Sequence, residues 1–347
     1  MPDFFGLDLG HHNIKIAKVI DKKLTNVGIF PTPAGSYGSE DPYLRKLMVE
    51  GIKSAMQAAK INSKNVVVAL PDNSVMSRLE VGFPALEDLE LNEAIIYEAR
   101  KYISYPIEEM RLDKIIVGEK IVDKVKLIDV FWVATTKSLV ERYISLLKLA
   151  DLNCLALETE SIANARLVNQ FSRNKKLITQ ENESVVIVDV GSEVTVVTVS
   201  QNDKVLFCQT LGNGSDSMSR IIAMTFNLDI ATADNYKKTY GLDPSYGGGK
   251  LAQVLDPLVK SLVDQIQKTI SFFRSKLPSI VPTKIFFTGD GSQLLGLTKY
   301  SEEILKTPTF LVDAFDSIEL SKEITEIKSR FSSSGFSVAI GLAMKEK

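Results

Sequence analysis

Histidine and cysteine are scarce in this chain of 347 residues, which contains two of each. Cys154 and Cys208 stand apart in apolar, strand-like runs, which is typical of unreactive buried thiols and excludes a framework of several disulfides. His11 and His12 are adjacent. A Ser-His-Asp triad or a zinc site would have to be built from that one turn, with no further imidazole or thiolate nearby in sequence, so we expect neither.

Concentrated charge and long apolar runs are also lacking. The 43 acidic and 41 basic residues give a formal net charge of −2, and no basic cluster would attract nucleic acid or an anionic membrane. No window approaches the roughly 18 consecutive apolar residues of a membrane span. The first residues lack the basic end and long apolar run of a signal peptide. We expect a soluble, intracellular protein.

Apolar residues make up 45% of the chain, enough for a substantial core, and the length suggests two domains or lobes at about 150 residues each. In the first half the patterns predict strands over 4–9, 14–20, 24–30 and 66–70 and a helix over 43–60. Residues 74–151 mix short strands with helices over 92–103 and 137–150, as expected of a compact α+β insert. A charged run over 172–183 marks the boundary between the halves.

The second half begins with the same pattern as the first. In the first half an apolar strand ends in Asp8-Leu-Gly10, and a strand with alternating apolar and polar residues follows the turn. The same pattern surrounds Asp189-Val-Gly191. This repetition predicts a duplication, with two lobes facing each other. Downstream, the patterns predict a helix over 251–276, strands over 284–288 and 309–315, and a closing apolar helix over 336–344.

The repeated turn suits phosphate chemistry. A glycine beside the aspartate exposes backbone N–H groups that bind phosphate oxygens, while the carboxylate holds Mg²⁺, usually through water. Lys15, on the returning strand, would add a positive charge. Taken alone, Asp8 or Asp189 is better explained as an ordinary turn residue. The matched pair favours a polyphosphate held from both sides.

Six segments, in order along the chain, carry a resemblance to a known superfamily. They are Gly-Leu-Asp-Leu-Gly-His-His-Asn-Ile-Lys at 6–15, Glu-Ser-Ile-Ala-Asn-Ala at 160–165, Asp-Val-Gly-Ser-Glu at 189–193, Gly-Asn-Gly at 212–214, Ala-Asp-Asn-Tyr-Lys at 233–237 and Thr-Gly-Asp-Gly-Ser-Gln-Leu-Leu-Gly at 288–296. The chain resembles the actin/Hsp70-type ATPases and, more closely, the PilM family of type IV pilus assembly proteins, which is related to the cell-division protein FtsA. Residues 81–94 and 98–106 support the narrower resemblance, because they are similar to the family's subdomain 1C.

The resemblance implies an α/β fold of the actin/Hsp70-like ATPase type. Two duplicated lobes would face a cleft, and an α+β insert, subdomain 1C, would lie in the first lobe. The expected ranges are 1–75 and 152–180 for subdomain 1A, 76–151 for 1C, 181–215 and 290–347 for 2A, and 216–289 for 2B. The closing helix, apolar on nearly every side, is expected to be a buried part of the fold rather than a membrane-surface helix.

The resemblance also implies binding of ATP or ADP with Mg²⁺. The nucleotide-binding residues carried over from the family's motifs are Asp8, Gly10, His11, His12, Asn13, Lys15, Asp189, Gly191, Ser192, Gly212, Gly214, Asp234, Lys237, Gly289 and Gly291. Asp8 and Asp189 would hold Mg²⁺, and Glu160 would orient an attacking water.

Three features depart from the family's pattern. His11 and His12 replace small hydroxyl residues, Asp290 replaces a glycine, and Asp234 replaces a glutamate. The backbone donors are retained, but the segments at 6–15, 233–237 and 288–296 are altered. We therefore expect slow or absent hydrolysis, with ATP acting mainly as a clamp between the lobes.

By the same resemblance, the expected function is that of a cytoplasmic adaptor of type IV pilus assembly or a related type II secretion-like system. The N-terminal cytoplasmic peptide of a PilN-like inner-membrane protein would lie between the insert and the first lobe and recruit the chain to the inner face of the membrane. Other pilus inner-membrane and motor components, and self-association, are further contacts that the resemblance allows. Two alternatives stay open: an FtsA-like filament-forming protein, and a small-molecule kinase on the same fold.

Overall fold

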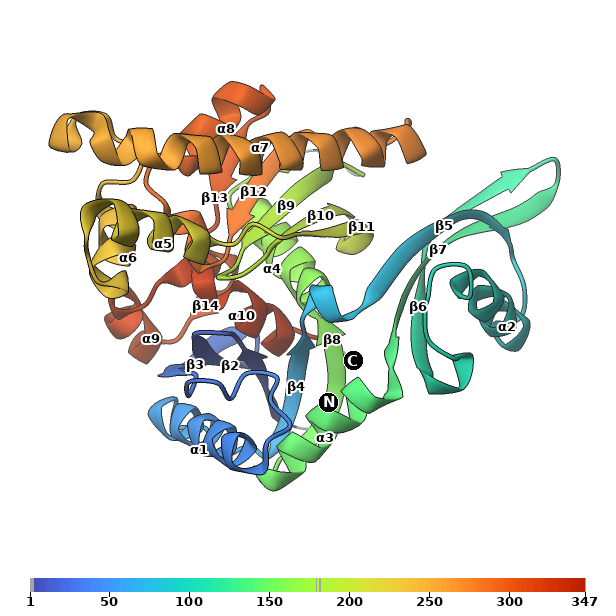
Figure 1. The fold of residues 1–347 in the computed structure, drawn as a ribbon. Coiled ribbons are helices and arrows are strands. Elements are labelled where there is room, and N and C mark those ends of the chain that lie inside the picture. Colours follow the sequence, from blue (N-terminus) through green and yellow to red (C-terminus); the bar gives the residue numbers. More distant parts are fainter. Residues whose placement is uncertain (1–2, 179, 181, 347) are drawn as a thin grey trace.

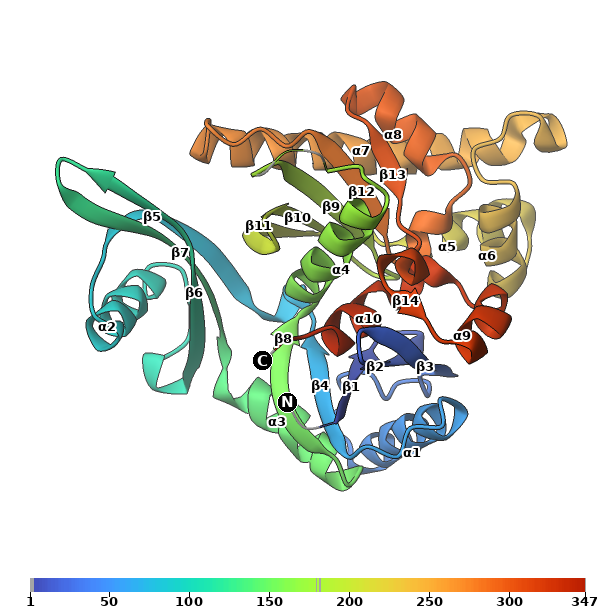
Figure 2. The ribbon, with the colours of Figure 1, turned by 180° about the vertical axis from the view of Figure 1, so that it is seen from behind.

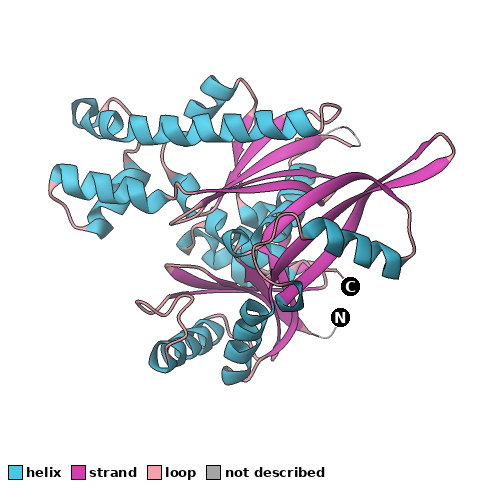
Figure 3. Ribbon diagram, turned by 45° about the vertical axis from the view of Figure 1, so that its right-hand side comes forward, coloured by secondary structure: helices cyan, strands magenta, loops and turns pink. Residues whose placement is uncertain are grey.

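Two lobes and a projecting insert make up the computed structural model, which describes residues 3–178, 180 and 182–346 (Figure 1). The strands among these residues form a six-stranded, a five-stranded and a three-stranded sheet, drawn in magenta in Figure 3. None of the described helices is both long and apolar enough to cross a lipid bilayer. The expected boundary between the lobes involves residue 181, which lies outside the described residues.

The sheet of the first lobe has the strand order β14-β3-β2-β1-β4-β8. Strands β1, β2 and β3 form an antiparallel meander, and β4 and β8 continue the sheet in parallel beyond β1. The elements of this lobe are β1 (Phe4–Leu9), β2 (Asn13–Ile20), β3 (Lys23–Pro31), α1 (Pro42–Ala58), β4 (Asn65–Leu70), α3 (Lys137–Leu149) and β8 (Asn153–Thr159). Helix α1 begins at Pro42 because the Asp41 carboxylate accepts hydrogen bonds from the first free N–H groups.

The sheet of the second lobe repeats this arrangement in the order β11-β10-β9-β12-β13. Here too an antiparallel meander is followed by parallel strands. The elements are β9 (Ser184–Val190), β10 (Thr195–Gln201), β11 (Lys204–Leu211), α5 (Ser215–Phe226), α6 (Ile230–Thr239), α7 (Lys250–Lys276), β12 (Lys284–Thr288), α8 (Leu297–Leu305) and β13 (Thr309–Leu311). The duplication expected from the repeated Asp-x-Gly unit is therefore confirmed. The last strand is shorter than expected, because the chain turns at Asp313 into a short 3₁₀ helix.

Two helices fill the space between the large sheets (Figure 2). Helix α4 (Glu160–Asn174) packs against α10 (Ser337–Ala343), which also packs on β1 and β2. All residues of α10 are buried, which confirms the expected burial of the closing helix. The two helices approach closely because Gly341 has no side chain. A Cβ at this position would lie 2.2 Å from the carbonyl oxygen of Ala163.

The structure differs from the expected subdomain ranges in two places. Strand β14 (Glu319–Leu320) pairs with β3, α9 (Lys322–Ile327) packs on β3 and α10 packs on the first sheet, so the end of the chain returns to the first lobe rather than remaining in 2A. Strand β12, expected within 2B, is instead a central strand of the second sheet. Apolar periodicity located these elements, but it does not specify the sheet on which an element packs.

The insert forms a separate sheet that projects to one side of the body, with the order β5-β7-β6 (Figure 1). Its elements are β5 (Met76–Pro84), α2 (Asp88–Ala99), β6 (Met110–Val122) and β7 (Val125–Thr136). Helix α2 packs Leu91 and Ile95 against Trp132, so the insert has its own core. The helix begins four residues before the expected start, at a first turn that contains Asp88 and Glu90, where negative charge favours the helix dipole.

Candidate functional site

A cavity of about 870 Å³ opens between the two lobes, a size suited to a small-molecule ligand. The expected site residues that line it are Asp8, Gly10, His11, His12, Asn13, Lys15, Glu160, Asp189, Gly191, Ser192, Asp234, Lys237 and Gly289. Within the described part of the chain, three expected residues do not line it: Gly212, Gly214 and Gly291. Gly214 and Gly291 lie where backbone segments meet behind it; a Cβ on Gly214 would lie 2.2 Å from the Ser192 carbonyl oxygen.

The two Asp-x-Gly turns have the same backbone hydrogen bond. In each turn the glycine N–H donates to the carbonyl oxygen three residues later, from Gly10 to Asn13 and from Gly191 to Val194, both at 3.0 Å. We refer to residues 8–15 as the first turn and residues 189–193 as the second turn. The duplication thus extends from strand order to the hydrogen bonding of the cavity wall.

The side chains around the two aspartates differ. Asp8 stands opposite Lys15 across β1 and β2, whereas Asp189 stands opposite Val196 across β9 and β10. Gly289 lies against the second aspartate with a φ of +83°, and a Cβ there would lie 2.2 Å from Asp189 Oδ1. A residue without a side chain is therefore needed for the backbone to pass this close to the carboxylate.

Asp8 is buried in a strongly charged environment. Burial raises its pKa, the Lys15 ammonium opposes that rise, and the carboxylates of Asp189 and Asp290 add to it, which brings the pKa to about 6. Ionisation of Asp8 therefore costs more free energy in the folded protein than in the unfolded chain, and a further cation would reduce that cost.

Two further acids on the cavity wall are perturbed in the same direction. Burial, followed by the charges of Asp72, Asp8 and Asp189, raises the pKa of Glu160 well above its ordinary value. Burial also raises the pKa of Asp189, although Asn164 Nδ2 opposes this by donating to its carboxylate at 2.7 Å. The cavity therefore gathers several carboxylates that repel one another.

This set of donors fits Mg²⁺. The ion prefers oxygen ligands and commonly keeps several waters. Asp8 and Asp189 supply carboxylate oxygens from opposite lobes, and the buried Oδ1 of Asn164 has no hydrogen-bond partner among the described residues. That oxygen can accept a hydrogen bond from a metal-bound water. A divalent cation at this position would also relieve the repulsion between the acids.

Two residues of the site were not identified from the sequence. Asp72, just beyond β4, accepts hydrogen bonds from the N–H and Oγ of Ser161 at 2.8 and 2.6 Å, which fixes the start of α4 and hence the position of Glu160. Asn164 lies on the same helix and reaches Asp189. One signal was available: Asp72 follows a continuously apolar strand, as do the aspartates of both turns. Asn164 had no comparable signal.

Lys15 is engaged by a carboxylate from the other lobe. Its Nζ lies 2.5 Å from Oδ2 of Asp290, and Oδ1 of the same carboxylate accepts a hydrogen bond from Ser332 Oγ at 2.9 Å. Burial alone would raise the pKa of Asp290, but Lys15 and Ser332 outweigh it and hold the pKa below its usual value. Asp290, which replaces a glycine of the family motif, therefore already pairs with Lys15, the residue expected to contact phosphate.

Asp234 and Lys237, both expected to bind the nucleotide, are held within the second lobe. Lys237 is buried and donates to the carbonyl oxygen of Ser215 and to Ser219 Oγ, at 3.2 and 2.8 Å. Asp234 lies 2.7 Å from both Lys237 and Lys238. Burial alone would raise the pKa of Asp234, but these lysines lower it to about 2. Lys237 thus joins α5 to α6 and keeps Asp234 ionised at the cavity wall.

His11 and His12 bridge the lobes at the mouth of the cavity. Nε2 of His12 lies 2.8 Å from Oδ2 of Asp216, and Nε2 of His11 lies 3.1 Å from Oε1 of Glu193. Both carboxylates belong to the second lobe, one in the second turn and the other in the first turn of α5. The histidines that depart from the family pattern therefore contact acids that no sequence pattern connects to them.

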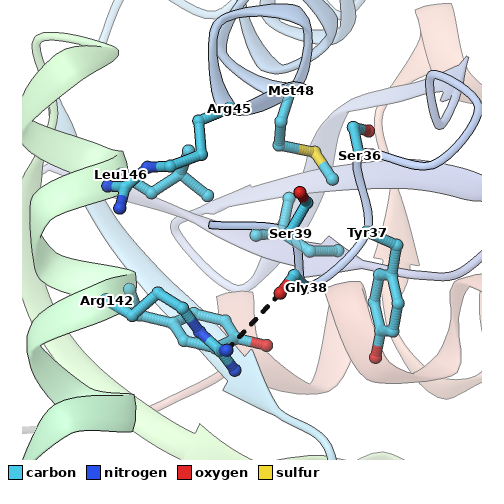
Figure 4. Close-up of a pocket in the computed structure, with 10 residues that line it drawn as sticks. Ser36, Tyr37, Gly38, Ser39, Arg45, Met48, Arg142 and Leu146 are labelled. Carbon is cyan, nitrogen blue, oxygen red and sulfur yellow. Dashed lines mark hydrogen bonds between the residues drawn. The ribbon is translucent and has the colours of Figure 1, made fainter. Parts of the chain in front are cut away.

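A second, small pocket of about 30 Å³ lies between α1, α3 and residues 36–39 (Figure 4). Its volume suits ordered water rather than a ligand. Figure 4 shows Arg142 of α3 reaching the carbonyl oxygen of Gly38, to which it donates at 3.4 Å. Tyr37 lines both this pocket and the large cavity, and its ring meets the ring of His11 edge-on at 5.2 Å. Residues 36–39 therefore connect α3, which follows the insert, to the first turn.

Comparison with known proteins agrees with this architecture. The model of a family described as "Type IV pilus assembly protein PilM" matches residues 6–347. A solved structure titled "PilM-PilN type IV pilus biogenesis complex" contains a chain that is 24% identical, with a TM-score of 0.82 over 99% of this chain and 98% of that one.

More distant structures share the fold. The ethanolamine utilization protein EutJ from Carboxydothermus hydrogenoformans is 12% identical, with a TM-score of 0.57 over 99% of this chain and 90% of its own. MreB 5 of Spiroplasma citri, solved with AMPPNP bound, is 13% identical, with a TM-score of 0.53 over 95% of each chain. The expected actin-like ATPase fold is confirmed by these similarities.

Replacing Asp8 by asparagine should stabilise the nucleotide-free protein at neutral pH. The folded-state pKa of about 6 exceeds the ordinary value of 3.8, so the unfolded chain releases this proton first and stability falls as the pH rises between those values. A neutral side chain of similar shape removes this loss. The free energy of unfolding should rise by about 2–3 kcal/mol near pH 7.5 and much less near pH 4.

Urea denaturation at both pH values measures this difference, with Asp123→Asn, on the exposed turn between β6 and β7, as the matched control. A gain of the same size at both pH values, or a loss near pH 7.5, would contradict the buried and repelled state of Asp8.

Proposed function

The chain belongs to the family of type IV pilus assembly proteins described as PilM, and from that premise we propose that it is an ATP-binding, actin-like cytoplasmic adaptor. It docks onto the N-terminal cytoplasmic tail of a PilN-like inner-membrane protein and is thereby held at the inner face of the membrane. The observation that carries the proposal is the pair of matched Asp-x-Gly turns, one from each lobe, that line a single cavity of about 870 Å³.

Nucleotide binding is supported by complementary groups on both sides of the cavity. The glycine turns bring backbone close to the position of a polyphosphate, and Asp8 and Asp189 supply carboxylates for a hydrated Mg²⁺. Burial makes these two acids unfavourable as bare anions, so the ion and the acids stabilise each other. ATP with Mg²⁺ therefore belongs between the two turns, where it joins the lobes.

Two features favour a clamp over fast hydrolysis. The raised pKa of Glu160 leaves a larger fraction of its carboxyl protonated near neutral pH, and a protonated acid is a poorer acceptor for an attacking water. Lys15 must also exchange Asp290 for a phosphate oxygen before it can contribute to binding. Asp290 therefore competes with the nucleotide for the same cation and weakens its binding.

The docking side is the junction of the insert with the first lobe. An extended tail offers backbone hydrogen bonds to a strand edge and side chains to shallow pockets, and the insert presents β5 and β6 as the two edges of its sheet (Figure 1). The chain returns from the insert through β7 directly into α3. Helix α3 contacts residues 36–39, which contact the first turn, so a tail bound here is physically connected to the cleft.

The burial of α10 favours this function over the FtsA-like alternative. A membrane-surface helix exposes an apolar face to lipid, whereas every residue of α10 is buried between the lobes. Membrane recruitment through a partner is the arrangement that this burial supports. No feature of the cavity favours the small-molecule kinase.

Asp189→Ala should abolish the rise in melting temperature that MgATP produces, because a ligand that binds only the folded state stabilises it by RT ln(1 + [L]/Kd). Asp290→Gly should enlarge that rise, because Lys15 is then free to contact phosphate. Thermal melting of each variant with and without MgATP tests both changes.

Asp203→Ala, an exposed carboxylate away from the cleft, serves as the control and should respond as the unmodified chain does. A full MgATP shift in Asp189→Ala would refute nucleotide binding between the turns. A smaller shift in Asp290→Gly would refute competition by Asp290.

Membrane recruitment should depend on the partner tail. Purified protein should stay in the supernatant when bare anionic liposomes are sedimented and should pellet with liposomes that display the N-terminal peptide of the PilN-like protein. A scrambled peptide of the same composition is the control. Equal pelleting on bare liposomes would favour direct membrane binding, and no pelleting with the displayed peptide would refute the docking proposal.

A further inference from the structure

Four side chains from the two lobes converge at the mouth of the cleft. His11 and His12 extend from the first turn, Glu193 extends from the second turn, and Asp216 lies in the first turn of α5. Each histidine Nε2 already faces a carboxylate oxygen of the opposite lobe, at 3.1 Å for His11 and 2.8 Å for His12. The arrangement thus contains two imidazoles and two carboxylates, with one of each kind in each contact.

The spacing of three of these donors is close to that of a metal site. One donor atom from each of His11, His12 and Asp216 lies within 4.8 Å of the other two. Donors around a tetrahedral zinc ion, at about 2.0–2.1 Å from it, lie roughly 3.3–3.5 Å apart. A contraction of about an ångström would bring these three donors to that spacing. The side chains of His11 and His12 are 37% and 56% exposed, so they can make this adjustment without disturbing the core.

We propose that His11, His12 and Asp216 form a binding site for a divalent transition-metal ion of the zinc type, with a water molecule completing the coordination. Imidazole nitrogen selects Zn²⁺, Co²⁺, Ni²⁺ and Cu²⁺ over Mg²⁺, which prefers oxygen ligands and octahedral geometry. The ion replaces the hydrogen that each Nε2 shares with its carboxylate, and the ring proton resides on Nδ1. The site is distinct from the buried carboxylates of Asp8 and Asp189.

The location gives such an ion a structural consequence. Two of its ligands belong to the first lobe and one belongs to the second, so the complete site exists only when the mouth of the cleft is closed. Binding therefore stabilises the closed arrangement of the lobes. No sequence pattern predicts this site, because the only two histidines are adjacent and their acidic partners lie in the other half of the chain. Folding of the two lobes brings Asp216 close to the two histidines.

The test uses the full chain, purified without a histidine tag, stripped with EDTA and free of nucleotide. Titration with Zn²⁺ by calorimetry should show one ion bound per chain, and the melting temperature should rise with Zn²⁺ but not with Mg²⁺ at the same concentration. Co²⁺ should give the visible absorption of a tetrahedral site. Because nucleotide is absent, this result does not depend on the proposed function.

Two variants, one from each lobe, locate the site. His12→Ala and Asp216→Asn should each weaken Zn²⁺ binding by about tenfold or more. Asp216→Asn keeps an acceptor for His12 in the metal-free protein, so its melting temperature in EDTA should match that of the unmodified chain. Asp203→Ala is the control for loss of an exposed carboxylate and should leave Zn²⁺ affinity unchanged. Absence of Zn²⁺ binding, or unchanged affinity in either site variant, would overturn the proposal.

Discussion

Burial of several carboxylates in one cleft, together with their mutual repulsion, is the constraint on which the rest of the site depends. Duplication places Asp8 and Asp189 at equivalent strand ends that face each other, and α4 adds Glu160 between them. Two neighbouring groups partly offset this negative charge: Lys15 lies beside Asp8, and Asn164 donates to Asp189. The cleft is consequently suited to a cation with a polyphosphate, and it is strained electrostatically without them.

The second lobe also contributes carboxylates that pair with side chains of the first lobe. Asp290 pairs with Lys15, and Glu193 and Asp216 meet the two histidines, so three polar contacts hold the lobes together across the cleft. These contacts include two of the features that depart from the family pattern. Side chains of this protein therefore join the lobes directly, which agrees with the proposed clamp more than with a rapid ATPase.

The sequence revealed the parts of this architecture that have local signals. Strand ends at Asp8 and Asp189, the strand leading to Gly289 and the closing apolar helix could all be predicted, because each has a periodic pattern or a turn residue at its end. The return of the chain to the first sheet could not be predicted, since an apolar pattern does not specify its partner. The same holds for Asn164 and for the contacts of the histidines, which join residues far apart in sequence.

Hydrogen–deuterium exchange with and without MgATP tests most directly the central claim that both turns hold one ligand. If one polyphosphate bridges the two turns, peptides covering residues 8–15 and 189–193 should become protected together at the same nucleotide concentration. Both sets of amides should respond although they belong to different lobes. Protection confined to one turn, or no change in either, would show that the two turns do not hold one ligand.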